Sequence, residues 1–170
     1  MTMFIIPENN KWSCLPASFS MACGVSFSKF IDMIGHNGDD RPYVDKSKRR
    51  GFHIQECIDV AWQLGFATTL IERYPATIYS YGDTEVCPIY TPEVVSLARF
   101  VQYLNVTKRG VLEGIRQRKD GSLAGHACAW DGSLIFDPSH RAYKFEDSEA
   151  NNFKPIGLMI LTEVHHDEED

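Results

Sequence analysis

The chain has 170 residues, of which 44% are hydrophobic, 12% aromatic and 24% charged, a composition that is ordinary for a globular protein and excludes disordered and fibrous classes. Its formal net charge of −6 at pH 7 argues against a nucleic-acid-binding protein. No apolar run approaches the roughly 18 residues of a membrane-spanning helix, and the N-terminal segment lacks the basic region of a signal peptide, so we expect a cytoplasmic protein without a membrane partner.

The first half of the chain has helical periodicity. Apolar residues at helical spacing predict a helix over 14–23, with Pro16 in its first turn. Ser26 is suited to cap a second helix over 27–34, which Gly35 would end. A polar stretch over 37–51 reads as a loop, and a third helix is predicted over 53–64 with Trp62 facing inward. Thr91-Pro92 marks the start of a fourth helix that continues to Leu104. The stretch 74–92 has no clear periodicity and reads as a cleft-side insertion or a long connection.

The second half of the chain changes to the period of strands. Strands are predicted over 111–117, 124–130, 134–136, 141–145 and 156–164. Asp120-Gly121 and Asp131-Gly132 are typical of tight hairpin turns between the first three of them. Helices followed by an antiparallel sheet predict an α+β fold with two lobes, and the cleft between the lobes is the expected place for a site. We expect one domain over 1–164 and a disordered acidic tail over 165–170.

The charged segments and the cysteines limit the partners and cofactors. Four basic residues in the loop over 37–51 are a weak phosphate-binding signal in an acidic chain, so we expect no nucleic-acid partner: Lys46, Lys48, Arg49 and Arg50. The five cysteines are odd in number and scattered, which argues against a disulfide framework. No CxxC or HxxxH pair occurs, so we expect no metal and no cofactor.

Cys14 differs from the other cysteines because it stands where a helix is predicted to begin. The unpaired N–H groups and the dipole at a helix N-terminus favour a negatively charged sulfur, and the thiolate is the nucleophilic form of cysteine. Cys23 lies at the opposite end of the same helix, where the dipole opposes a thiolate. Cys57 and Cys128 lie within a predicted helix and strand and read as core residues. Cys14 is therefore the candidate nucleophile, with a half-buried structural thiol as the alternative.

His126 and Asp137 form the second half of a candidate catalytic group. His126 opens a predicted strand, and alternation places it on one face with Cys128 and Trp130. In a hairpin that turns between Asp131 and Gly132, His126 lies opposite Asp137, so one imidazole nitrogen meets the carboxylate and the other is free for a thiol.

Two alternatives remain for the histidine. His140, just beyond Asp137-Pro138, is the substitute base if His126 has another role. A metal site formed by His126, Cys128 and His140 is the weakest alternative, because no recurring zinc spacing supports it.

Two segments carry a resemblance to a known family. SCLPASFSMACG, followed about 110 residues later by GHACAWDGSLIFDPSH, resembles the papain-like fold in its compact bacterial form. The pattern is similar to the bacteriocin leader-processing peptidase domains of peptide-exporting transporters and their free-standing relatives. The resemblance spans roughly residues 5–164 and implies a Cys14–His126–Asp137 triad, a cysteine peptidase acting on a peptide or protein, and a bacterial or phage origin.

The chain departs from this family at two positions before and after the nucleophile. The family places a glutamine six residues before the cysteine, where its amide stabilises the oxyanion, and this chain has Glu8 there. Asn9 and Asn10 are the nearby amides that can replace it. The glycine that follows the cysteine in the family is replaced by Leu15.

Residues beside the candidate triad read as parts of a substrate cleft. Trp12 precedes the nucleophile and is suited to line the cleft, and Gly125 leaves room beside His126. We expect hydrolysis of a peptide or isopeptide bond through a thioester. Two alternatives stay open: transfer of the acyl group to an amine by the same triad, and a catalytically silent papain-like domain that binds a partner protein. The oligomeric state is not predicted.

Overall fold

The computed structural model describes residues 3–7, 12–38, 51–73, 79–81, 84–86 and 95–164. Over these ranges the helices are α1 (Cys14–Cys23), α2 (Phe27–Ile34), α3 (Ile54–Gln63), α4 (Leu97–Val106) and the short 3₁₀ helix η1 (Phe145–Asp147). The strands are β1 (Phe66–Glu72), β2 (Tyr79–Tyr81), β3 (Thr84–Val86), β4 (Gly110–Gln117), β5 (Leu123–Trp130), β6 (Ile135–Asp137), β7 (Arg141–Tyr143) and β8 (Lys154–Glu163).

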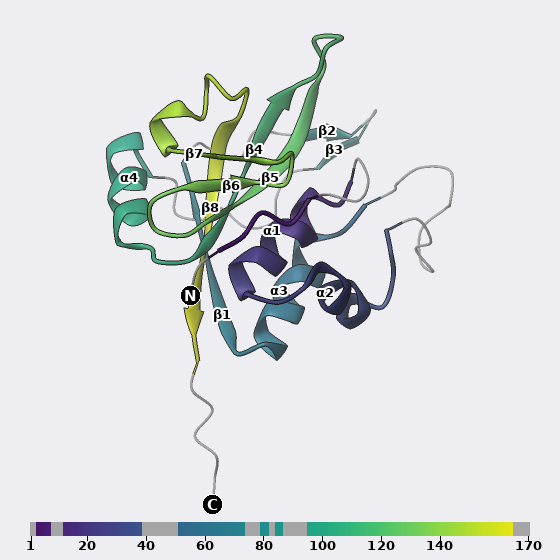
Figure 1. Cartoon of the computed structure of the whole chain (residues 1–170). Coiled ribbons are helices and arrows are strands. Elements are labelled where there is room, and N and C mark those ends of the chain that lie inside the picture. Colours follow the sequence, from purple (N-terminus) through teal and green to yellow (C-terminus); the bar gives the residue numbers. More distant parts are fainter. Residues whose placement is uncertain are drawn as a thin grey trace, which may run out of the picture.

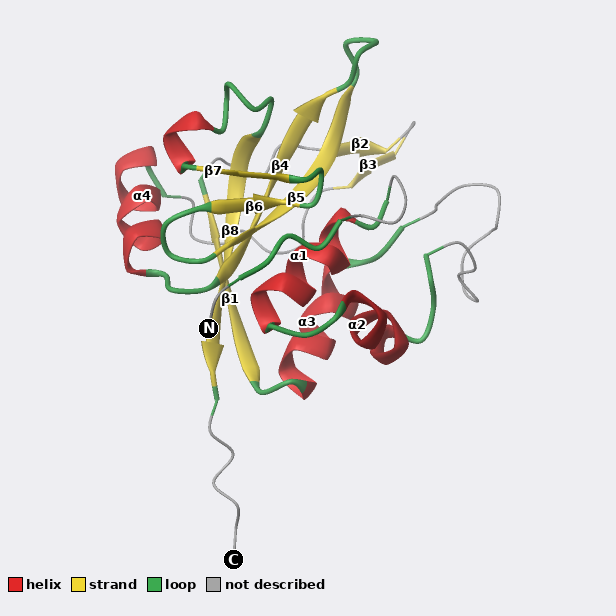
Figure 2. Cartoon of the chain, viewed as in Figure 1, coloured by secondary structure: helices red, strands yellow, loops and turns green. Residues whose placement is uncertain are grey.

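Six of the strands form one antiparallel sheet in the order β1-β8-β4-β5-β6-β7. Strands β2 and β3 pair with each other in a separate hairpin. Figure 1 shows α1, α2 and α3 grouped on one side of the sheet and α4 on the other, and Figure 2 shows the same arrangement by element type. The predicted α+β class is confirmed.

Strand β5 lies between two hydrophobic clusters because its side chains alternate between the two faces of the sheet. Ala127 and Ala129 pack in the cluster that α1, α2 and α3 share with the sheet. Cys128 and Trp130 pack in the other cluster, which includes Phe100 and other residues of α4. The alternation predicted for this strand is confirmed, and the two layers hold β5 from both sides.

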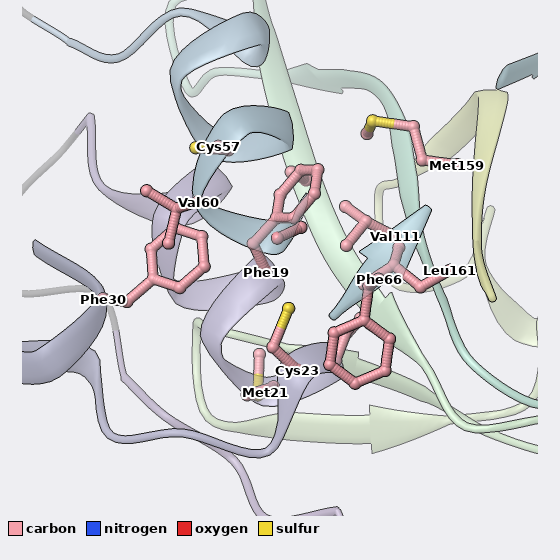
Figure 3. Close-up of a cluster of buried hydrophobic side chains, with 14 residues drawn as sticks. Phe19, Met21, Cys23, Phe30, Cys57, Val60, Phe66, Val111, Met159 and Leu161 are labelled. Carbon is pink, nitrogen blue, oxygen red and sulfur yellow. The ribbon is translucent and has the colours of Figure 1, made fainter. Parts of the chain in front are cut away.

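The first cluster fixes the position of α1 against the sheet. Phe19 of α1 is fully buried, and its ring centroid lies 6.1 Å from that of Phe30 in α2. In Figure 3, Phe19 lies between the helices and Val111 of the sheet. Because every residue after Leu15 in α1 is buried, the helix has little freedom to move, and its first residue is held at a set place.

The ends of the first two helices follow the local sequence. Gly24 and Gly35 adopt the left-handed conformation, with φ of 71° and 86°, and end α1 and α2. Ser26 caps α2 by accepting a hydrogen bond from the N–H of Lys29 at 3.3 Å. The predictions for both helices are confirmed at both ends.

Three expectations for the middle of the chain are wrong. Residues 66–72 form strand β1, although the first half of the chain reads as helical. Trp62 is 54% exposed, so it lies on the outer side of α3 and not in the core. Helix α4 begins at Leu97, because Ser96 caps it by accepting from the N–H of Arg99 at 3.3 Å. Thr91 and Pro92 lie outside the described residues.

No single helix in the described ranges is long and apolar enough to cross a membrane. Helices α1 and α2 reach that length and composition only together, and they are bent by 113° at the break between them. Several predicted features lie outside the described residues: the basic cluster over 46–50, Cys87, and the acidic tail over 165–170.

Candidate active site

Cys14 is the first residue of α1, where N–H groups of the first turn have no partner within the helix. Its N-cap, Ser13, is completely buried, while Cys14 itself is half-buried. Among the cysteines that the structure describes, Cys14 is the one that is not buried. Burial raises the pKa of the Cys23 thiol to about 12 and that of Cys128 to about 11. Exposure and helix position thus both distinguish Cys14 as the candidate nucleophile.

His126 of β5 and Asp137 of β6 are in direct contact, with His126 Nε2 lying 3.0 Å from Asp137 Oδ1. The register that places them there differs from the predicted one. Ala129 pairs with Phe136 and Trp130 with Ile135, so four residues, 131–134, connect the strands. Asp131 closes this loop, because its Oδ1 accepts from the N–H groups of Ser133 and Leu134 at 2.9 and 2.8 Å.

The longer loop moves Asp137 by two residues along the ladder. If the observed register is extended to the end of β6, Asp137 lies opposite Cys128. His126 then lies diagonally next to Asp137, on the same face of the sheet. The predicted contact between His126 and Asp137 is present, but the directly opposed pairing around Asp131-Gly132 is wrong. A shift of two residues keeps a side chain on the same face of a sheet, and the contact survives for that reason.

Asp137 is fully buried and accepts hydrogen bonds on both carboxylate oxygens. Oδ1 accepts from the backbone N–H of Ser139 at 2.8 Å in addition to its contact with His126. Oδ2 accepts from Arg116 Nη2 at 2.5 Å and from the Tyr143 hydroxyl at 3.3 Å. Arg116 Nη2 also lies 3.3 Å from Ser139 Oγ, which joins the turn after β6 to β4. The carboxylate therefore has a fixed orientation toward His126.

Hydrogen bonds outweigh burial in shifting the pKa values of His126 and Asp137. Burial alone would lower the pKa of His126, but hydrogen bonds with Asp137, Cys128 and Cys14 raise it well above 6.5. Burial would raise the pKa of Asp137, but the hydrogen bonds from His126 and Ser139 hold it below its usual range. At neutral pH the group therefore contains an imidazolium and a carboxylate.

The imidazole of His126 connects Asp137 to Cys14. Its Nε2 is in contact with Asp137, and a hydrogen bond with the Cys14 thiol is among the contacts that raise the pKa of His126. Phe153 packs edge-on against the imidazole, with centroids 5.6 Å apart at 86°. His126 is therefore in contact with Asp137 and close to Cys14, and the assignment of the three residues as a triad stays a prediction.

The remaining sequence candidates have different outcomes. Glu8, Asn9 and Asn10, the predicted oxyanion residues, lie outside the described residues. Gly125 is exposed, and a Cβ placed there meets no atom within 4 Å, so there is open space on that side of β5.

Two further candidates are described by their local surroundings. Trp12 is half-buried and lies against Gly38, where a Cβ would come 3.1 Å from Trp12 Cδ1. His140 is exposed in the β6–β7 turn with φ of 73°, and its N–H donates to the Asp137 carbonyl at 3.1 Å. This position at the end of the turn makes His140 a poor substitute for His126.

Sequence reasoning missed three residues around Asp137: Arg116, Ser139 and Tyr143. Arg116 lies on the same face of β4 as the apolar residue Leu112. A charged residue on an otherwise apolar face of a strand is the signal by which Arg116 could have been found. Tyr143 belongs to a three-residue strand, which is too short for its face to be assigned from periodicity.

In this fold, a helix that begins with a cysteine packs on an antiparallel sheet whose neighbouring strands carry a histidine and an aspartate in contact. No family model matches the chain, and no curated protein sequence matches it.

Similar chains occur among the solved structures. The chain is similar to a double glycine motif protease from an AMS/PCAT transporter, solved in complex with the leader peptide, with a TM-score of 0.51 and 14% identity over 96% of this chain and 93% of that one. It also matches the peptidase domain of Streptococcus mutans ComA, with a TM-score of 0.45 and 15% identity over 93% of this chain and 98% of that one. The first similarity confirms the predicted fold, which is that of a double glycine motif peptidase domain.

Proposed function

We propose that the chain is a cysteine peptidase in which Cys14 is the nucleophile, His126 the general acid and base, and Asp137 the residue that orients His126. One observation carries this proposal: the imidazole of His126 contacts Asp137 through Nε2 at 3.0 Å and is within hydrogen-bonding reach of Cys14. A nucleophile, a base and an orienting group in this order are what acyl transfer from an amide requires.

The first half of the reaction forms a thioester. The Cys14 thiolate attacks the carbonyl carbon, and the backbone N–H of Cys14, with the amide of Asn9 or Asn10, stabilises the negative charge on the carbonyl oxygen. The C–N bond then breaks as Nδ1 of the His126 imidazolium gives its proton to the leaving amine. An acyl group remains on the sulfur, and His126 is neutral.

The second half of the reaction hydrolyses the thioester. Neutral His126 takes a proton from water, and the water oxygen attacks the acyl carbon. The C–S bond breaks, the carboxylic acid leaves, and the thiolate–imidazolium pair is restored. Asp137 stays ionised throughout and holds Nε2–H in place, because Arg116, Ser139 and Tyr143 fix its carboxylate.

A peptide with small residues before the scissile bond is the substrate class that we propose. The similar AMS/PCAT protease is a double glycine motif enzyme that was solved with its leader peptide. Gly125, the residue before His126 in β5, is exposed, and a Cβ there would meet no atom within 4 Å, so the strand is open to a peptide at this point. Transfer of the acyl group to an amine would use the same residues, and the proportion of amide and acid products formed with an added amine distinguishes the two reactions.

Glu8 favours a second candidate, a catalytically silent domain that binds a peptide without cleaving it. A carboxylate at the position of the family glutamine repels an oxyanion unless it is protonated. If this candidate is correct, Glu8→Gln introduces or strongly raises turnover in a chain that binds peptide but does not cleave it.

The test is cleavage of a mixed peptide library in which some members contain Gly-Gly or Gly-Ala pairs, with products read by mass spectrometry. We expect cleavage after the small pair, loss of at least about a thousandfold in Cys14→Ala and His126→Ala, and wild-type cleavage in Cys23→Ala. Cleavage that persists in Cys14→Ala would contradict the mechanism. Peptide binding without cleavage in the wild type would favour the silent domain.

A further inference from the structure

A second thiol lies inside the candidate site, and the proposed reaction does not use it. Cys128 follows His126 by two residues on the same face of β5 and is fully buried. Its Sγ lies 3.9 Å from the Tyr143 hydroxyl, and it is also in hydrogen-bonding contact with His126. The thiol therefore has two polar neighbours, Tyr143 and His126, inside a cluster that is otherwise hydrophobic.

Three donor atoms converge beside this thiol. One ring nitrogen of His126, Sγ of Cys128 and one carboxylate oxygen of Asp137 all lie within 4.8 Å of one another. His126 Nε2 is the ring nitrogen that lies 3.0 Å from Asp137 Oδ1. Bond lengths of about 2.3 Å to sulfur and 2.0–2.2 Å to nitrogen and oxygen put the ligands of a tetrahedral Zn²⁺ about 3–4 Å apart, so a cation requires only a small closing movement.

The surroundings would hold these ligands in place. The N–H of Ser139 donates a hydrogen bond to Asp137 Oδ1, while Arg116 and Tyr143 donate to Oδ2. These bonds fix the orientation of the Asp137 carboxylate, including Oδ1, the proposed ligand atom. Hydrogen bonds of this kind from outside a metal site orient its ligands and raise metal affinity. Sulfur, imidazole and carboxylate are together a donor set that suits Zn²⁺ and excludes Mg²⁺ and Ca²⁺, which prefer oxygen ligands.

We propose that Cys128, His126 and Asp137 form a binding site for a thiophilic divalent cation, Zn²⁺, and that the bound ion switches the enzyme off. The ion bonds to Cys128 Sγ, His126 Nε2 and Asp137 Oδ1, and water fills the fourth position. The protons of the Cys128 thiol and of Nε2 pass to solvent, and no group is oxidised or reduced. The thiolate and the carboxylate balance the charge of the ion.

The inhibitory part of this proposal rests on the proposed function, whereas the binding part does not. With the ion on Nε2 and the remaining ring proton on Nδ1, neither ring nitrogen has a free lone pair. The imidazole then takes no proton from water, so turnover stops while the Cys14 sulfur stays unligated. Because binding releases protons, affinity for the ion rises with pH.

The experiment titrates the reduced protein with Co²⁺, which reports a thiolate ligand by a charge-transfer absorption band, and with Zn²⁺ in a calorimeter. Buffers with different ionisation enthalpies give the number of protons released. The variants are Cys128→Val and Cys128→Ser at the site, Cys14→Ser at the nucleophile, and Cys23→Ala as the matched control for a buried thiol, each checked for folding by circular dichroism.

We expect one ion per chain with a cobalt–thiolate band in the wild type, Cys14→Ser and Cys23→Ala. Both Cys128 variants should lose the band and bind at least about tenfold more weakly. Unchanged binding in a folded Cys128 variant, or a band that disappears in Cys14→Ser, would overturn the proposal. A normal band in a chain that never cleaves peptide would overturn the proposed function alone, and cleavage without any band would overturn the metal site alone.

Discussion

Gly114 of β4 lies directly across the ladder from His126 of β5, and the register between β4 and β8 shifts at this point. A Cβ at position 114 would lie 2.1 Å from the carbonyl oxygen of Lys154 and 2.9 Å from Phe153 Cε2. The same Phe153 packs edge-on against the imidazole of His126. The absence of a side chain at Gly114 therefore allows the packing that holds the base.

Gly114→Ala tests this relationship. The added methyl group meets backbone at Lys154, which cannot yield as a flexible side chain would, so we expect a loss of about 2 kcal/mol in the free energy of unfolding. Displacement of Phe153 should also slow peptide cleavage in the folded fraction. Urea unfolding and a cleavage assay measure the two effects. Gly125→Ala is the matched control for stability, because its Cβ meets nothing within 4 Å, and equal destabilisation by both variants would disprove this account.

Arg116 is the positioning residue for Asp137. Arg116→Met removes the hydrogen bond to Oδ2 of a fully buried carboxylate, so we expect a loss of about 2 kcal/mol in stability and a slower reaction of Cys14 with iodoacetamide. Arg116→Lys keeps the charge and one contact and should fall between wild type and Arg116→Met. Arg118→Met, an exposed arginine two residues further on, serves as control. A folded Arg116→Met variant with wild-type alkylation kinetics would remove Arg116 from the site.

Glu113 gives the stability of the protein a dependence on pH. Burial, with a smaller contribution from the charge of Glu72, raises the pKa of Glu113 from 4.5 to about 7. The folded chain therefore binds this proton more tightly than the unfolded chain, and the free energy of unfolding falls as the pH rises from about 4.5 to about 7. Above that range the loss is constant, at no more than about 3 kcal/mol.

Glu113→Gln should remove most of this dependence. The amide carries no charge, so we expect the variant to be more stable than wild type at pH 8 and similar to it at pH 4. Urea unfolding at several pH values checks this. A variant whose stability falls with pH as steeply as that of the wild type would show that other groups cause the dependence.

Much of the site could be predicted because its residues carry local signals. Cys14 stands at a helix start that Pro16 marks, and Gly24 ends the same helix in the left-handed conformation. His126 and Asp137 come from adjacent strands of one hairpin, and their contact tolerates a change in loop length from two residues to four because such a change preserves the face.

Other features depend on distant parts of the chain. Strand β1 escaped prediction because it pairs with β8, about 90 residues later, and that partner supplies its hydrogen bonds. Arg116 and Tyr143 meet Asp137 only after β4, β6 and β7 have assembled. The helical period predicts that Trp62 faces the core, but the buried face of α3 is formed by Cys57, Val60 and Ala61, and Trp62 lies outside it. Which face of a helix is buried depends on how the helix packs on the rest of the chain.

The most direct test of the central claim is the rate at which iodoacetamide alkylates Cys14 in wild type and in His126→Ala, measured between about pH 4 and 9 with peptide mass spectrometry. We predict rapid labelling of Cys14 at about pH 6, where an ordinary thiol with a pKa of about 8.5 reacts slowly, and loss of that rapid labelling in His126→Ala. Labelling of Cys14 that follows the pH dependence of an ordinary thiol and is unchanged in His126→Ala would contradict the claim.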